Sequence, residues 1–315
     1  MDEKISGPEQ SIPQSDALLG TVLSRLMRLS EPKVPQGIAS ILENRLKTEH
    51  IYPPDTLYTF GKSAMLWSSE VADPGFFESI RAENPNGYVV GTGAAMTLAL
   101  VTCFKKENPP KGIVIADIQP EVIAFGKLLV GSLAKAKTRN DFERDFLSIS
   151  EEEYRSRVKN IIDKEKDKEL KRRYKKRKPT FLYIDWHLGY YRHGPNYLVE
   201  KKVQLVDIIR IVLNNFDLFH NLAVNGNIAI AFVDFTDPRF INAIKDLPDF
   251  RSVKNLIYSS NIEQVSHFPD MSQLEAYTNT VLPPIFISTA DRSKTLHLQT
   301  DPEVFKRKTA KAPGM

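Results

Sequence analysis

The chain has 315 residues, of which 42% are hydrophobic, and a formal net charge of +4, so it is long and apolar enough to bury a large core. No apolar run approaches the roughly 20 residues that a membrane-spanning helix requires, and we therefore expect no membrane partner and a cytoplasmic location. The single cysteine, Cys103, excludes an internal disulfide and a zinc site built from several cysteines.

The first 84 residues are predicted to precede the main sheet. Residues 1–16 are rich in Ser, Gln, Glu and Pro, and we expect a disordered lead-in there. Apolar residues recur at helical spacing in Ala17–Leu29 and Pro35–Leu46, and the segments Tyr58–Ser69 and Pro74–Ala82 follow. These patterns predict an N-terminal helical cap over residues 17–84.

Strands and helices alternate through residues 85–302, before a basic tail at residues 303–315. This alternation predicts an α/β, Rossmann-like, doubly wound and mostly parallel sheet. Helices are expected in Ala94–Phe104, from Pro120 to Leu133, in Tyr197–Leu222 with a stop at Asn225-Gly226, and in Arg239–Leu247. Strands are expected from Tyr88 to the glycine turn and in Gly112–Asp117, Phe181–Asp185, Asn227–Val233, Val253–Tyr258, Ile285–Ser288 and Thr295–Leu298, the last two as a hairpin.

A charged helical insertion is predicted at residues 137–178. Residues 151–178 alone hold 13 Lys/Arg against 7 Asp/Glu, which leaves the rest of the chain slightly acidic. Sparse apolar residues predict one or two protruding amphipathic helices, and a solvated excursion is favoured over a binding role. The cluster Lys171–Lys178 could contact phosphates, so nucleic acid stays an alternative partner. It is not favoured, because acids interleave with the bases in Lys164–Glu169.

A glycine turn followed by an acidic strand end is the most informative pattern in the chain. Gly91-Thr-Gly93 ends a β-branched run and opens into an apolar helix, which is how a parallel sheet brings a ligand against bare backbone. Asp117 ends the next strand, where a carboxylate can accept hydrogen bonds from both hydroxyls of a ribose. Met96 replaces the third glycine of the dinucleotide fingerprint, which favours S-adenosylmethionine, a nucleoside without phosphate, over NAD. A strand-to-helix turn that binds nothing is the other interpretation.

The predicted sheet collects four polar strand ends on one edge, because ligands of parallel sheets bind at the carboxyl ends of the strands. Gly91, Thr92 and Gly93 would meet the amino-acid part of the cofactor, and Asp117 with Ile118 the ribose. Asp234 could accept from an adenine amine, and Phe235 could line the apolar edge of the ring. Ser260 and Asn261 would then face the transferred group or the substrate.

With these features the chain resembles class I S-adenosylmethionine-dependent methyltransferases, in an atypical, bacterial-type branch. The resemblance covers Asn86 to about Leu298, through the glycine motif, Asp117, and the runs Ala231–Pro238 and Leu256–Asn261. In that family the corresponding places hold the glycine loop, the ribose acid, the adenine acid and the loop beside the methyl group. The Asp/Asn-Pro-Pro-Tyr/Phe loop of amino-group methyltransferases is not present, so the resemblance leaves the acceptor open.

Methyl transfer asks a protein mainly to align a nucleophile with the methyl group, so a general base is optional. Asp185 is the first candidate base because it ends a predicted buried strand, and His187, His193 and Tyr190 follow it. The spacing His187-x5-His193 lacks carboxylates for a metal site. Nearby aromatic residues favour a small-molecule acceptor. The alternatives are a weak or inactive methyltransferase fold acting as a binding or effector module, an RNA methyltransferase, and an NAD-dependent oxidoreductase.

Overall fold

The structure is a computed structural model that describes residues 37–49, 76–176, 208–235, 237–260, 285–288 and 297–299. Several sequence predictions lie outside these residues. They are the disordered lead-in, the helix Ala17–Leu29, the segment Tyr58–Ser69, the strand Phe181–Asp185 with the residues that follow it, Asn261, and the basic tail.

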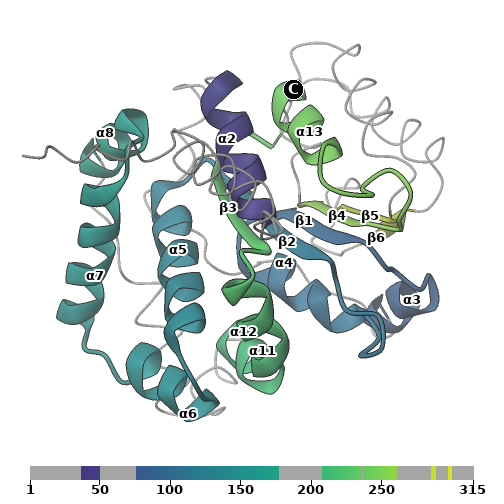
Figure 1. Cartoon of the computed structure of the whole chain (residues 1–315), viewed down its shortest axis with the longest axis horizontal. Coiled ribbons are helices and arrows are strands. Elements are labelled where there is room, and N and C mark those ends of the chain that lie inside the picture. Colours follow the sequence, from purple (N-terminus) through teal and green to yellow (C-terminus); the bar gives the residue numbers. More distant parts are fainter. Residues whose placement is uncertain are drawn as a thin grey trace, which may run out of the picture. The chain divides into compact units, whose positions relative to one another are not determined.

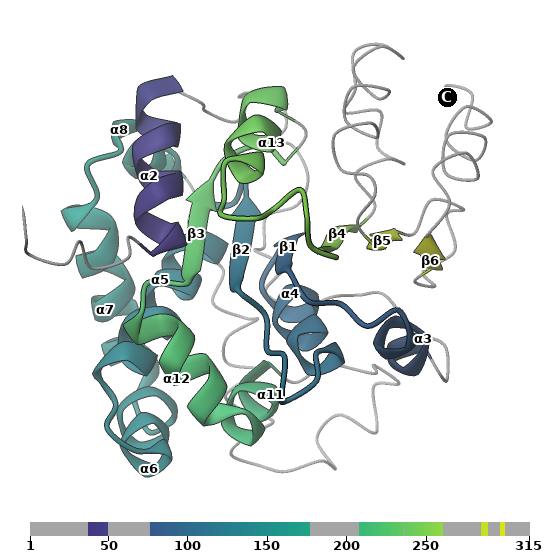
Figure 2. The ribbon, with the colours of Figure 1, turned by 45° about the vertical axis from the view of Figure 1, so that its right-hand side comes forward.

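Within the described residues the strands form one sheet in the order β3-β2-β1-β4-β5-β6 (Figure 2). β3, β2, β1, β4 and β5 are parallel to their neighbours, and β6 is antiparallel to β5. The chain runs outward from β1 to β3 and then returns to β4 on the other side of β1, so the strand order reverses between β1 and β4. The strands are β1 Tyr88–Thr92, β2 Gly112–Asp117, β3 Ile228–Phe232, β4 Leu256–Ser260, β5 Ile285–Ser288 and β6 His297–Gln299.

One face of the sheet carries the larger core. Strand residues such as Val89, Ile115 and Phe232 pack there with helices α3 (Phe76–Ala82), α4 (Ala95–Ala99) and α5 (Pro120–Lys135). Helices α11 (Ile208–Asn214) and α12 (Phe216–Val224) belong to the same core. The predicted helix after the glycine turn is α4 followed by a 3-10 turn, Leu100–Cys103.

The opposite face carries a second core, formed with α2 (Ile38–Glu49) and α13 (Pro238–Lys245). Val90, Val114 and Ala229 are buried on this side, whereas their neighbours along each strand are buried on the other. Both faces are therefore covered, which explains why β1 and β2 read as continuous apolar runs. The mixed α/β class with a parallel sheet is confirmed.

Two predicted boundaries have clear local causes. Pro120 occupies the first turn of α5, where its missing N–H costs nothing, as the sequence indicated. Gly226 has φ of +66°, and the N–H of Asn227 donates to the carbonyl of Leu222 (2.7 Å), so α12 ends at the predicted stop. The long helix expected before this stop is broken, because Asn215 separates α11 from α12.

The charged insertion is helical but does not protrude, which corrects the sequence prediction. It contains α6 (Arg139–Phe142), a π-helical turn (Glu143–Leu147), α7 (Glu151–Lys164) and α8 (Lys168–Lys176). Tyr154, Val158 and Ile162 on α7 are each at most 3% exposed and belong to the same core as α5. Figure 1 shows α7 and α8 beside α5. A few apolar residues suffice to pack α7 against the core because they lie on one stripe of that helix.

Candidate ligand site at the carboxyl edge of the sheet

The two glycines after β1 have different structural roles. A Cβ atom on Gly91 would lie 2.4 Å from Oγ1 of Thr97 and 3.1 Å from Cδ1 of Tyr258, so only glycine lets α4 pack this close to the strand. Gly93 has φ of +68°, a conformation that favours glycine, and a Cβ atom there would meet no atom of the described residues within 4 Å. Gly93 therefore makes the turn, and the described part of the chain leaves space in front of it.

The turn is held by a side chain of the helix that follows. Oγ1 of Thr97 donates to the carbonyl of Gly93 (2.8 Å), and Thr97 is fully buried. Met96, at the position of the third fingerprint glycine, is 1% exposed and belongs to the larger core. The position of the third glycine of dinucleotide-binding proteins is therefore filled here by a bulky core side chain.

Asp117 lies beside this turn, as the sequence predicted. Thr92 pairs with Ala116, so Asp117 follows directly at the end of the neighbouring strand. Its Oδ2 accepts from the N–H of Gly93 (3.1 Å), and its Oδ1 accepts from the N–H of Gln119 (2.8 Å). The N–H of Ile118 adds a third backbone hydrogen bond. A carboxylate has about four lone-pair sites, so about one acceptor position remains for a ligand.

The electrostatic state of Asp117 follows from its surroundings. Burial raises the pKa of its carboxyl from 3.8 to about 7, against the hydrogen bonds from Gln119 and Gly93, which lower it. Asp117 is still partly exposed, as is Ile118, so a ligand can reach it. Because burial raises its pKa to about 7, the carboxyl can change its charge near neutral pH.

The end of β3 brings a second acid to this edge. The N–H of Val233 donates to the carbonyl of Asp117 (3.1 Å), so Asp234 lies one residue beyond the last hydrogen bond between β2 and β3. Asp234 is 9% exposed. The ring of Phe235 is 2% exposed and packs against Phe240, with 5.7 Å between ring centroids, so it supports this end of the sheet from within the core. The adenine roles given to Asp234 and Phe235 stay predictions.

Asp237 and Ser260 are the other polar residues near this edge of the sheet. Asp237 accepts from the N–H of Arg239 (2.8 Å) and pairs with its guanidinium, so this acid caps α13. Ser260 ends β4, next to β1, and pairs with Ser288 of β5. The structure thus places the glycine turn, Asp117, Asp234 and the end of β4 on one edge, while Asp185 and Asn261 lie outside the described residues.

Most described members of the basic cluster are engaged within the chain. Nζ of Lys171 donates to the carbonyl of Asp163 (2.7 Å), and Arg172 and Arg173 both pair with Glu169. These contacts, the bond from Arg172 first, lower the pKa of Glu169 to about 2. Arg173 is only 4% exposed. Three residues of the cluster are therefore engaged within the insertion, and a phosphate contact stays a prediction.

One feature of the molecule gave no signal in the sequence. A cavity of about 730 Å³ follows the edge of β3, between α2, α5 and the turn that joins α7 to α8. Its lining includes neither Gly93 nor Asp117. It is assembled from four segments that are far apart in the chain, so no local pattern could indicate it.

No described group of His, Cys, Asp and Glu could hold a metal ion, and no described helix has the length and hydropathy to cross a membrane. No protein-family model matches the chain, and a search of curated proteins found no match.

Proposed function

We propose that the chain is an S-adenosylmethionine-dependent methyltransferase with a Rossmann-like sheet, acting on a small-molecule acceptor. The observation that carries the proposal is the Asp117 carboxylate held against the N–H of Gly93, at the ends of two adjacent parallel strands. Beside them the strand order reverses between β1 and β4, and open α/β sheets bind ligands at such a reversal.

The order of the strand ends matches the order of groups in the cofactor. The space at Gly93 would take the amino-acid part, and the remaining acceptor position of Asp117 would take a ribose hydroxyl. Asp234, one strand further out, would accept from the adenine amine. Neighbouring strands lie about 4.8 Å apart, so the three adjacent ends span about 10 Å, which would reach from the amino-acid part across the ribose to the adenine.

The chemistry requires little beyond alignment. The acceptor's lone pair attacks the methyl carbon while the carbon–sulfur bond breaks, and its electron pair returns to sulfur to give the uncharged thioether. An acceptor that carries a proton loses it to a base, for which Asp185 is our candidate. The end of β4 with Asn261 would orient the acceptor, because it lies on the other side of the reversal point.

Calorimetric titration with S-adenosylmethionine and its demethylated product tests this proposal. We expect micromolar binding by the full chain and a loss of at least about tenfold in Asp117→Asn, since an amide cannot replace both carboxylate oxygens. Asp217→Asn, an exposed acid on α12, is the matched control and should bind like the wild type. No binding by the wild type would overturn the proposal, and binding of NAD instead would favour hydride transfer.

A further inference from the structure

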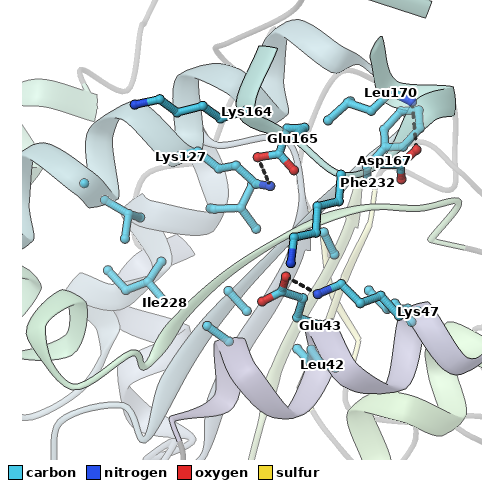
Figure 3. A pocket seen from close by; sticks show the side chains of 18 residues that line it. Leu42, Glu43, Lys47, Lys127, Lys164, Glu165, Asp167, Leu170, Ile228 and Phe232 are labelled. Atoms are coloured by element: carbon cyan, nitrogen blue, oxygen red, sulfur yellow. Dashed lines mark hydrogen bonds and ion pairs between the residues drawn. The ribbon is translucent and has the colours of Figure 1, made fainter. Parts of the chain in front are cut away.

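The cavity along β3 is a groove with an apolar floor, which we name the β3-edge groove (Figure 3). All of Ile228–Phe232 lines it. Leu42 and Leu46 of α2, Val130 of α5 and Leu170 of α8 also line it, and Leu170 lies beside Phe232 in Figure 3. Its volume of about 730 Å³ lies within the range of protein ligand pockets.

The backbone of β3 presents hydrogen-bonding groups to this groove. The carbonyl of Asn227 accepts from the N–H of Ile113 (2.9 Å), and the N–H of Val233 donates to the carbonyl of Asp117 (3.1 Å), so the odd-numbered residues face β2. In a parallel ladder, alternate residues point the other way. Ile228, Ile230 and Phe232 therefore turn their N–H and C=O groups to the groove, and they have no backbone hydrogen bond there within the described ranges.

The two helical layers leave this edge uncovered. α2 packs on the face of Ala229 and Ala231, and α5 packs on the face of Ile230, where a Cβ on Gly126 would come within 3.0 Å of the Ile230 side chain. The helices thus stand above and below the sheet, and the space beside β3 lies in the plane of the sheet. An added strand would occupy that plane, about 4.8 Å from β3.

The charges around the groove favour an acidic occupant. Its lining holds four lysines and three acids. Lys47 pairs with Glu43, Nζ of Lys127 lies 2.6 Å from Oε1 of Glu165, and Asp167 accepts from two N–H groups that begin α8. Lys164 and Lys166 are exposed, and Lys166 lies close enough to Glu43 to help lower the pKa of that carboxyl.

We propose that the β3-edge groove binds an extended acidic segment of a partner protein, which adds to the sheet as a strand of about five residues beside β3. Only an extended backbone offers N–H and C=O groups at the spacing of Ile228, Ile230 and Phe232. Acidic side chains of such a segment would reach Lys164 and Lys166. The groove is separate from Gly93 and Asp117, so this inference does not depend on the proposed function.

The test uses blocked, fluorescein-labelled hexapeptides with glutamate at every second position and varied apolar residues between them. Fluorescence anisotropy with the full chain should find members with dissociation constants of roughly 1–100 μM. Copies of the best binder with N-methyl groups on the amides that face β3 should bind at least about tenfold more weakly, because they cannot pair with the strand. Lysine in place of glutamate should weaken binding similarly.

Two pairs of variants locate the site. Ile230→Pro removes one N–H from the free edge, where proline is tolerated, and should reduce affinity about tenfold, whereas Ile230→Val keeps that N–H and should bind normally. Lys164→Glu with Lys166→Glu should also reduce affinity about tenfold. Lys159→Glu with Lys168→Glu makes the same charge change on exposed residues that do not line the groove, and should leave affinity within about twofold.

Hydrogen exchange supplies a readout that does not depend on the variants. Peptide binding should slow exchange at the amides of Ile230 and Phe232, while Ala229 and Ala231 stay slow with or without peptide. Failure of the whole library to bind below about 1 mM would overturn the proposal. Equal binding of the N-methylated copies would also overturn it. So would slow exchange at Ile230 and Phe232 in the free chain, because it would mean that another segment of the chain fills the groove.

Discussion

The raised pKa of Asp117 predicts that this carboxyl makes the folded chain less stable as the pH rises. The pKa is about 7 in the folded chain and 3.8 as the reference for the unfolded chain. Between these values the folded state binds more protons than the unfolded state, so the free energy of unfolding falls as the pH increases through the folded pKa. At 1.36 kcal/mol per pKa unit, the contribution changes by about 3 kcal/mol between pH 5 and pH 8.

Urea denaturation of the wild type and of Asp117→Asn at pH 5, 6, 7 and 8 measures this contribution. Asparagine keeps the shape of the side chain and can still accept one backbone hydrogen bond, but it does not titrate. Subtracting the two free energies of unfolding removes the titration of all other groups. The difference, wild type minus variant, should fall by about 3 kcal/mol, most steeply between pH 5 and pH 6, and should level off above pH 7.

Two results would refute this reasoning. A difference that stays constant from pH 5 to pH 8 would show that Asp117 titrates below this range, with hydrogen bonds from Gly93 and Gln119 outweighing its burial. A difference that rises with pH would reverse the sign altogether.

The other predictions concern packing around the site and the insertion. Gly91→Ala should lower the free energy of unfolding by about 1–3 kcal/mol, because its Cβ would meet the buried Thr97, and an unchanged urea midpoint would contradict the packing described. Gly93→Ala should cost about 1–2 kcal/mol through its left-handed backbone alone, and its methyl group should weaken S-adenosylmethionine binding in calorimetry by occupying the open space. Ile162→Ala should lower the free energy of unfolding by about 2–5 kcal/mol, because α7 shares the core. The exposed Asn160→Ala should lower it by less than about 0.5 kcal/mol, and an equally small effect of both variants would indicate a solvated insertion.

Local sequence patterns predicted much of the described fold. The strand Gly112–Asp117 was expected with the bounds that β2 has, because a continuous apolar run ended in an acid. The stop at Gly226 and the start at Pro120 were also expected, since each depends on the backbone chemistry of one residue. The antiparallel pair of β5 and β6 confirms the predicted terminal hairpin. Adjacent strands then brought Gly93 and Asp117 together, as alternation of strands and helices implied.

Features that depend on distant contacts could not be predicted. The many charges of α7 concealed a single apolar stripe, and only the position of α5 decides that this stripe is buried. Arg173 belongs to a basic run in the sequence, yet its guanidinium lies over the ring of Phe232, 5.5 Å from the centroid. The depth at which Phe235 is buried is likewise set by Phe240, on the helix that follows.

The most direct test of the central claim is the affinity of the full chain for S-adenosylmethionine at pH 6 and pH 8, in the wild type and in Asp117→Asn. Only the ionised carboxylate keeps both oxygens as acceptors for the backbone and for a ribose hydroxyl, and a pKa of about 7 makes it about tenfold more abundant at pH 8 than at pH 6. Between pH 6 and pH 8 the affinity of the wild type should therefore increase about tenfold more than the affinity of Asp117→Asn does. Absence of binding, or binding with the same strength and pH dependence in both proteins, would contradict a cofactor site at Gly93 and Asp117.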